Sequence, residues 1–262
     1  MNTPSPRFQE FFFSLYEGLP RQGTGNRACA ARALALCAEL GPAPAIIDLG
    51  CGVGGQTWHL AELTVGTITA IDSHAPSIER MRQGIAQRGL AQRITALVGD
   101  MAAPPVAPPG GFDLVWSEGA LYSVGLAQAL AVCHALLRPG GYLAFTDAVW
   151  RSDVPPAEVR AGFEADSPTV GRVDDNRAAT RAAGFRLADH FPLPDAAWWD
   201  DFYTPMTQRI NVLRQQHAGD AEAAAILDQL AKEPELHRRF GHHYAYEFFV
   251  ARKAPAGGAG GN

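Results

Sequence analysis

The stretch AIIDLGCGVGGQTWHLAEL, from Ala45 to Leu63, decides the fold class. An apolar run of strand length enters a glycine-rich turn, and a helical pattern follows directly. Gly50, Gly52 and Gly55 give the spacing G-x-G-x-x-G, which is typical of the point where a strand meets a helix in an α/β nucleotide-binding unit. The stretch therefore predicts a parallel α/β fold that holds a nucleotide-containing cofactor at this turn, and the rest of the chain must show which one.

Apolar runs and helical patterns alternate on both sides of the turn. Buried strands are expected at 45–49, 67–72, 93–100, 112–118 and 141–149, and helices at 5–19, 26–40, 55–64, 75–89 and 125–137. Strands that are apolar on both faces and joined through helices predict a doubly wound parallel sheet up to about Trp150. The run HHYAYEFFVARK at 242–253 alternates aromatic and polar residues, which indicates an antiparallel last strand.

The chain is interpreted as one domain over 1–252. Residues 1–42 are expected to form a helical cap, 43–150 the cofactor-binding half, 151–240 an acceptor-side lid with its helices, and 241–252 the last strand. The low-complexity tail at 253–262 is expected to be disordered.

Composition and charge narrow the classes of partner. The chain has 262 residues, 47% of them hydrophobic, and a net charge of −5, which is ordinary for a soluble globular protein. This balance gives no electrostatic drive toward nucleic acid or an anionic membrane, and no apolar run is long enough to cross a bilayer. The four cysteines never form a C-x-x-C pair and are interpreted as reduced thiols of a cytoplasmic protein without a signal peptide. A homodimer stays open.

Histidines gather in the run HRRFGHHY at 237–244. His242 and His243 would point to opposite faces of a strand, and no cysteine or carboxylate completes a set at metal-ligand spacing. No metal site is expected.

Acids stand at the ends of the first three expected strands. Asp48 gives the turn the form D-x-G-x-G-x-G, and its carboxylate suits an ammonium, directly or through water, whereas it would repel a pyrophosphate placed there. Asp72 suits the two ribose hydroxyls of either kind of cofactor. Asp100 suits the exocyclic amine of adenine, with Met101 beside the ring. The three acids together indicate a cationic adenosine derivative without phosphate, such as S-adenosylmethionine.

The motifs IIDLGCGVGG, ITAID, VGDM and FDLVWSEGALYSVG, in this order, resemble the class I S-adenosylmethionine-dependent methyltransferases. The segments LPRQGTG, LRPGGYLAFTDAVW and YAYEFFVARK are similar to a group of bacterial small-molecule methyltransferases, so the resemblance covers nearly the whole chain apart from the tail. It implies a Rossmann-like α/β fold with a seven-stranded, mostly parallel sheet, an antiparallel last strand, N-terminal helices and a helical lid insertion.

The resemblance also implies that Arg21, Gln22 and Gly23 close over the methionyl end of the cofactor. Thr24 departs from the group, which has proline at this position, and indicates a differently shaped clamp. The residues expected to bind the cofactor are Arg21, Gln22, Gly23, Asp48, Gly50, Cys51, Gly52, Gly55, Asp72, Ser73, Asp100, Met101 and Ser117.

The acceptor is expected beyond the carboxyl end of the fourth strand, where ligands of open α/β sheets lie. Glu118 is a candidate to accept from a substrate amine, to act as a general base or to orient Tyr122; alternatively it caps the following helix. Glu118 and Tyr122 are the expected catalytic residues. The residues expected to bind a small-molecule acceptor are Glu118, Tyr122, Trp150, Trp199 and Tyr203. The stretch lacks the Asn/Asp-Pro-Pro-aromatic sequence of many adenine and glutamine methyltransferases, which argues against those acceptors.

The expected reaction is an in-line displacement in which the protein aligns the nucleophile, the methyl group and the sulfur. Two alternatives stay open. An NAD(P)-dependent oxidoreductase would use the same turn but would leave Asp48 and Asp100 without a role. A non-catalytic S-adenosylmethionine-binding protein would keep Asp48 and Asp72 but would have no use for WSEGALY.

Overall fold

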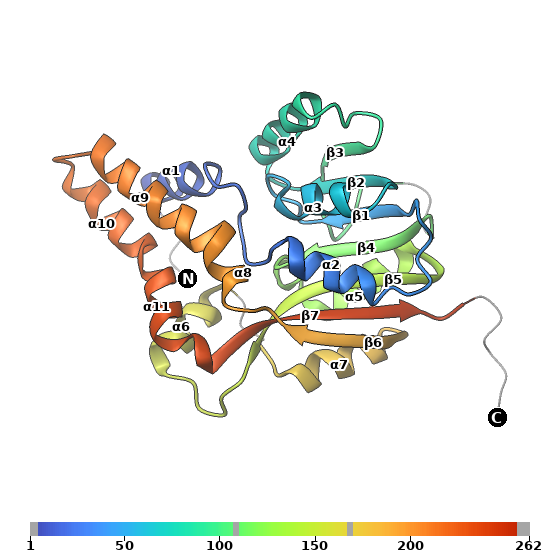
Figure 1. The fold of residues 1–262 in the computed structure, drawn as a ribbon. Helices are drawn as coiled ribbons and strands as arrows, with labels where there is room; N and C mark the ends of the chain where they lie inside the picture. Colours follow the sequence, from blue (N-terminus) through green and yellow to red (C-terminus); the bar gives the residue numbers. More distant parts are fainter. Residues whose placement is uncertain (1–4, 107–109, 167–169, 256–262) are drawn as a thin grey trace.

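A computed structural model describes residues 5–106, 110–166 and 170–255 (Figure 1). Within these residues, seven strands form one sheet in the order β3-β2-β1-β4-β5-β7-β6. The strands are β1 (Ala45–Leu49), β2 (Thr67–Asp72), β3 (Ile94–Val98), β4 (Phe112–Glu118), β5 (Leu137–Trp150), β6 (Phe185–Pro192) and β7 (Tyr244–Lys253). Strands β1 to β5 pair in parallel, and β7 runs antiparallel to both β5 and β6. The seven-stranded, mostly parallel sheet with an antiparallel last strand is confirmed.

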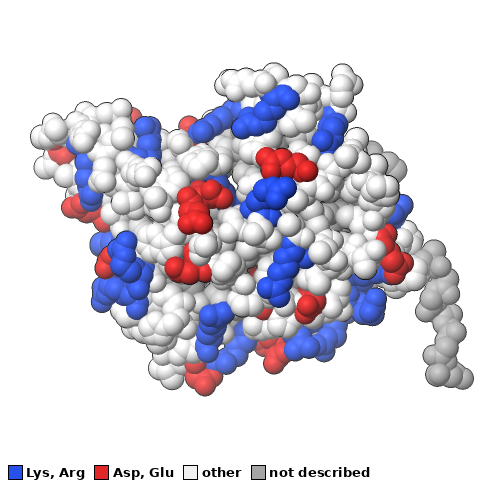
Figure 2. All heavy atoms as spheres, viewed as in Figure 1, with Lys and Arg blue, Asp and Glu red and all other residues white. Residues whose placement is uncertain are grey.

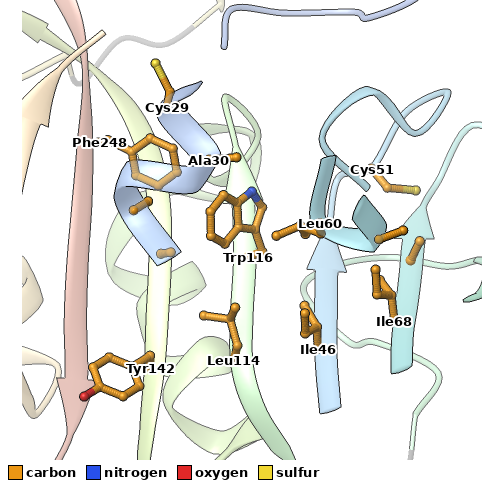
Figure 3. Packing of buried hydrophobic residues seen from close by; sticks show 14 of the residues in the cluster. Cys29, Ala30, Ile46, Cys51, Leu60, Ile68, Leu114, Trp116, Tyr142 and Phe248 are labelled. Atoms are coloured by element: carbon orange, nitrogen blue, oxygen red, sulfur yellow. The ribbon is translucent and has the colours of Figure 1, made fainter. Parts of the chain in front are cut away.

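Both faces of the sheet are buried, as the apolar strands predicted. Successive residues of β1 point to opposite sides: Ile46 packs in one apolar cluster and Ile47 in another, and neither is exposed. Helices α2 (Arg27–Ala35), α3 (Gly55–Leu63) and α4 (Ala75–Gln87) contribute to the first cluster, and α5 (Leu126–Leu136) and α7 (Val173–Ala182) to the second. Figure 3 shows the first cluster, in which Trp116 of β4 lies among Ala30 of α2, Leu60 of α3 and Phe248 of β7.

A third apolar cluster forms the lid beyond the carboxyl ends of the parallel strands, on the left of Figure 1. It is built on α6 (Ala157–Asp166), α8 (Ala196–Trp198), the π-helical turn η2 (Trp199–Tyr203), α9 (Thr204–Gln216), α10 (Ala221–Leu230) and α11 (Lys232–Phe240). Helix α1 (Pro6–Tyr16) packs against α9 and α10, whereas α2 packs against the sheet. The predicted N-terminal cap therefore divides between lid and sheet, and the domain boundaries drawn from the sequence stay a prediction.

The ends of the elements follow local hydrogen bonding. Asn26 caps α2 by accepting from the Cys29 amide, as expected, but the helix ends at Ala35 rather than at residue 40. Strand β5 begins at Leu137, directly after α5, and β7 begins at Tyr244 because 241–243 form the 3₁₀ turn η3 (Gly241–His243). The expected disordered tail is wrong at Lys253, whose ammonium donates to two carbonyls; its last part, 256–262, lies outside the described residues.

The surface mixes charges of both signs. Lys and Arg side chains lie among Asp and Glu over the face shown in Figure 2, and several form exposed ion pairs, such as Arg27 with Glu62. In the part of the chain that the structure describes, no helix has the length and apolar character needed to pass through a membrane.

Candidate cofactor and acceptor site

The glycine turn connects β1 to α3 in a conformation that needs its glycines. Gly50, Gly52 and Gly54 all have positive φ, at 74°, 53° and 95°, which L side chains rarely adopt. A Cβ on Gly50 would collide with the Cβ of Ala120, and one on Gly52 would collide with Oε1 of Gln22. The turn is therefore in close contact with the segment after β4 and with the N-terminal segment.

Asp48 lies beneath this turn and is fully buried. Its carboxylate accepts from the Thr57 hydroxyl at 2.5 Å and from the Gln56 side-chain amide at 3.2 Å, both in the first turn of α3. Burial raises the pKa of Asp48 to about 7, although the two hydrogen bonds act in the opposite direction. Asp48 thus connects β1 to the first turn of α3 through hydrogen bonds. Its role as an acceptor for the ammonium of a cofactor stays a prediction.

Asp72, at the end of β2, joins the turn to the next loop. Its two oxygens accept from the amides of Gly52 and His74, each at 2.8 Å, and the residue is half-buried. Ser73 beside it is exposed. His74 in turn contacts helix α1, because its ring stacks on Phe13 and its Nε2 lies 2.7 Å from a carboxylate oxygen of Glu17. The predicted ribose site thus lies next to a contact between α4 and the lid.

Asp100 and Met101 follow β3. Asp100 is exposed, and one of its oxygens accepts from the Ala102 amide at 2.8 Å. The methyl group of Met101 reaches toward the glycine turn, 3.2 Å from where a Cβ on Gly50 would lie. The structure therefore brings Met101 next to the glycine turn.

The N-terminal segment before α2 lies on the glycine turn. Gln22 accepts from the Val53 amide at 3.2 Å and donates to the Ser77 hydroxyl at 3.5 Å. A Cβ on Gly55 would lie 2.8 Å from Cγ of Arg21. The resemblance implies that Arg21, Gln22 and Gly23 close over the methionyl end of the cofactor, and the structure brings Arg21 and Gln22 into contact with the turn expected to bind it.

Arg21 and Glu118 form a buried ion pair, with side chains 4% and 1% exposed. The guanidinium donates from Nη2 to Glu118 Oε2 at 2.5 Å and to the Thr24 carbonyl at 2.7 Å, and from Nε to the Gly23 carbonyl at 2.8 Å. The Trp116 indole donates to Glu118 Oε1 at 2.8 Å. Nη1 of Arg21 is buried and has no hydrogen-bond partner among the described residues.

Three further predicted residues occupy different surroundings. Ser117 is fully buried and donates to the Leu49 carbonyl at 2.8 Å, which ties β4 to β1. Tyr122 is half-buried in the 3₁₀ turn η1 (Leu121–Val124) that follows β4. Cys51 of the glycine turn is buried, and burial raises the pKa of its thiol well above the ordinary value.

The aromatic residues predicted to bind the acceptor beyond η1, namely Trp150, Trp199 and Tyr203, lie in separate places. Tyr203 is 2% exposed, contacts Phe202 and donates to Glu233 at 3.2 Å, so it lies inside the lid rather than facing an open pocket. Trp150 packs edge-on against Phe163 of α6. Neighbouring lid aromatics enclose the ring of Tyr203, and its role in binding an acceptor stays a prediction.

Trp199 lines a surface hollow of about 530 Å³. The hollow is bounded by Arg151, Leu193, Asp195, Trp198, Trp199, His237, Arg238, Gly241, His242, Tyr244 and Ala245. Trp198 packs edge-on against Tyr246, whose ring in turn lies 3.5 Å from where a Cβ on Gly119 would be. Trp198 and Tyr246 therefore stand between the hollow and the end of β4.

Trp116 and Gly25 are site residues that the sequence reasoning missed. Trp116 could have been found from its spacing, since residues i and i+2 of a strand share a face and Glu118 is the second residue after it. Gly25 carries no such signal, because its closeness to Glu118 arises only in the fold. Among the described residues, no group of three or more His, Cys, Asp or Glu side chains is arranged to hold a metal ion.

Comparison with known proteins finds a methyltransferase domain in part of the chain. A family described as a methyltransferase domain matches residues 46–141, which run from within β1 through the glycine turn and β4 into the start of β5. These residues therefore carry a methyltransferase domain, in agreement with the resemblance to the class I S-adenosylmethionine-dependent methyltransferases. The chain is 27% identical over 186 residues to a sterol 24-C-methyltransferase from Gibberella zeae, covering 67% of this chain and 47% of that protein.

A second relative is the sarcosine/dimethylglycine N-methyltransferase from Halorhodospira halochloris, 29% identical over 163 residues, which cover 61% of this chain and 58% of that protein. The chain thus spans about half the length of these curated relatives. Its fold is similar to a solved methyltransferase from Geobacter sulfurreducens in complex with S-adenosylhomocysteine, with a TM-score of 0.77, 20% identity, and coverage of 94% of this chain and 98% of that one. The names of the two curated relatives give different acceptors, a sterol for one and sarcosine or dimethylglycine for the other.

Proposed function

We propose that this methyltransferase binds S-adenosylmethionine at the glycine turn and transfers its methyl group to a small-molecule acceptor. When bound, the cofactor supplies a methyl group on a positively charged sulfur, and this sulfur is the leaving group when a nucleophile takes the methyl group in line. The protein's own task is then to align the reactants, which can contribute roughly 7–11 kcal/mol in well-oriented reactions.

The unpartnered Nη1 of Arg21 carries the proposal. Buried polar groups nearly always have hydrogen-bond partners, so a buried guanidinium nitrogen without one indicates a place for a ligand. A guanidinium pairs best with a carboxylate or a phosphate. Asp48 and Asp72 flank the same turn and disfavour a phosphate, whereas the amino-acid end of S-adenosylmethionine offers a carboxylate together with an ammonium.

The remaining cofactor contacts are proposed from position. Asp72 and Ser73 lie at the end of β2, where the ribose hydroxyls of nucleotide cofactors bind in α/β folds. Asp100 and Met101 would hold the adenine at the end of β3. Asp48 would face the ammonium through water, because its oxygens are already engaged by Thr57 and Gln56. The backbone of Gly50, Cys51 and Gly52 would line the cofactor, and Gly23, Gly55 and Ser117 would keep the surrounding segments close.

The acceptor is proposed to be a small molecule. This is supported by the lid that covers the strand ends and by the names of the relatives, which include a sterol and an amine methyltransferase. Tyr122, Trp150 and Trp199 stay candidates for acceptor contacts. Glu118 is a poor candidate for the general base, because both of its oxygens already accept hydrogen bonds.

Titration calorimetry with four compounds tests the cofactor. Binding of S-adenosylmethionine and S-adenosylhomocysteine, without NAD or NADP, is expected. Binding of a dinucleotide alone would overturn the proposal and favour an oxidoreductase.

Incubation with methyl-labelled S-adenosylmethionine then tests the acceptor, with a metabolite pool and a peptide pool as separate arms. Label in a metabolite is the expected result. Label in peptides alone would contradict the small-molecule acceptor. Cofactor binding without transfer to either pool would favour a non-catalytic binding protein.

A further inference from the structure

We infer that Trp116 and Glu118 are positioning residues, which hold Arg21 so that its free Nη1 faces the carboxylate of the cofactor. This inference rests on the proposed function and adds to it the pair of residues that would set the geometry of the methionyl end.

The hydrogen bonds of Arg21 leave one of its guanidinium nitrogens, Nη1, without a partner in the described structure. A guanidinium has five N–H groups in a planar fork. Nε and Nη2 are occupied by the carbonyls of Gly23 and Thr24 and by Glu118, which fixes the plane and rotation of the fork. Only Nη1 has no partner in the described structure. Its direction is therefore set by the groups that hold the other two nitrogens.

Glu118 links the guanidinium to the rigid sheet. One of its oxygens accepts from Arg21 and the other from Trp116, so the carboxylate bridges two donors. Trp116 is fully buried, and its indole packs edge-on against Phe248 at 5.2 Å (Figure 3). Because Trp116 and Glu118 lie on the same face of β4, the chain of contacts runs from the centre of the sheet to the N-terminal segment.

Gly25 allows this approach and connects it to the lid. Its φ is 129°, and a Cβ there would collide with both Glu118 and Arg21. Its amide donates to the Ala197 carbonyl in α8 at 2.9 Å. The segment that carries Arg21 is thus held on one side by β4 and on the other by the lid.

The pairing gives Glu118 a structural task that competes with proton transfer. A buried charge that loses its partner is strongly unfavourable. A proton taken up by Glu118 would leave the Arg21 charge buried without a counter-charge. Glu118 therefore acts through Arg21 on the cofactor and does not receive the acceptor's proton.

The test compares two ligands that differ only at the methionyl end. S-adenosylhomocysteine carries the carboxylate, and 5′-methylthioadenosine has the same nucleoside but lacks the amino-acid end. Glu118→Asp keeps the charge but is one methylene too short to bridge both donors. Trp116→Phe keeps an aromatic side chain but removes the N–H.

Both variants are expected to bind S-adenosylhomocysteine about tenfold more weakly, which corresponds to the loss of one charge-assisted hydrogen bond. Their affinity for 5′-methylthioadenosine should stay within about twofold, because that ligand does not reach Arg21. Glu62→Asp is the matched control, since it makes the same chemical change in the exposed ion pair with Arg27; it should change neither affinity.

Equal weakening of both ligands in both variants would show a merely structural role and overturn the inference. Unchanged affinity for S-adenosylhomocysteine would overturn it as well. If Glu118→Asp fails to fold, Trp116→Phe carries the same comparison. Failure of the proposed function is distinguishable, because the parent protein would then bind neither ligand.

Discussion

Asp48→Asn should remove a pH dependence of folding stability that the buried carboxylate creates. Asp48 is fully buried beneath the glycine turn, and burial raises its pKa from the ordinary 3.8 to about 7. Below pH 3.8 the group is protonated in both the folded and the unfolded protein, and above pH 7 it is ionised in both. Between these values the folded protein binds the extra proton, so the free energy of unfolding falls as the pH rises.

The size of the effect follows from the same two values. A difference of one pKa unit corresponds to about 1.36 kcal/mol, and the shift from 3.8 to about 7 is close to three units. The contribution of Asp48 to stability should therefore decrease by about 4 kcal/mol from acid to neutral pH. Asparagine has one oxygen for two donors, Gln56 and Thr57, which costs stability equally at every pH. The diagnostic quantity is thus the pH dependence, not the stability at one pH.

Urea unfolding of the parent and of Asp48→Asn, measured between about pH 4 and about pH 8, gives this comparison. The difference in free energy of unfolding between the two proteins should shift by about 4 kcal/mol in favour of the variant as the pH rises. Asp147→Asn is a matched control, because burial also raises the pKa of Asp147, in its case to about 6. The free energy of unfolding of this variant relative to the parent should change less with pH, and the change should end at a lower pH. Parallel curves for the parent and Asp48→Asn would refute the reasoning.

Three other substitutions test separate parts of the site. Asp72→Ala should weaken binding of S-adenosylhomocysteine by about 1.5–3 kcal/mol for each hydrogen bond lost to the ribose, measured by calorimetry, and unchanged affinity would show that the ribose assignment is wrong. Gly25→Ala should lower the free energy of unfolding by roughly 1–3 kcal/mol, because the residue has φ 129° and a Cβ would collide with Glu118; a variant as stable as the parent in urea would contradict this close approach. Tyr203→Phe removes the hydrogen bond to Glu233 and should cost about 0.5–1.5 kcal/mol of stability without slowing methyl transfer. A large fall in the rate of methyl transfer at unchanged free energy of unfolding would instead indicate that Tyr203 contacts the acceptor.

The elements were predictable wherever a local pattern determined them. The glycine spacing and the two-sided apolar strands predicted the parallel sheet, and Asn26 marked the start of α2. The strand predicted from Gly141 began four residues late, because β5 begins at Leu137 and includes an irregular stretch with Gly140 before its regular pairing to β4. Whether a glycine breaks a strand depends on its neighbours across the sheet, and one sequence does not contain that information.

The four acids at the strand ends also show that local sequence does not determine burial. Four carboxylates follow or end strands, and their positions in sequence are alike, yet they have two different fates. Asp72 and Asp100 accept from backbone amides and remain accessible: His74 and Ala102 lie two residues further along, and Asp72 also accepts from Gly52 of the glycine turn. Asp48 and Glu118 are buried and accept from side chains of other elements, Thr57 on α3 and Arg21 on the N-terminal segment.

The difference decides which acids can act on a ligand directly. An exposed carboxylate keeps lone pairs for a ribose or an amine, whereas a buried one is already committed to the donors that made its burial possible. The donor to Glu118 on the N-terminal segment is Arg21, and its Nη1 has no hydrogen-bond partner in the described structure. A buried acid at a strand end can therefore still serve a ligand, but through the cation that it orients. Substitutions of the cation that such an acid orients should therefore alter ligand binding more than substitutions of the acid.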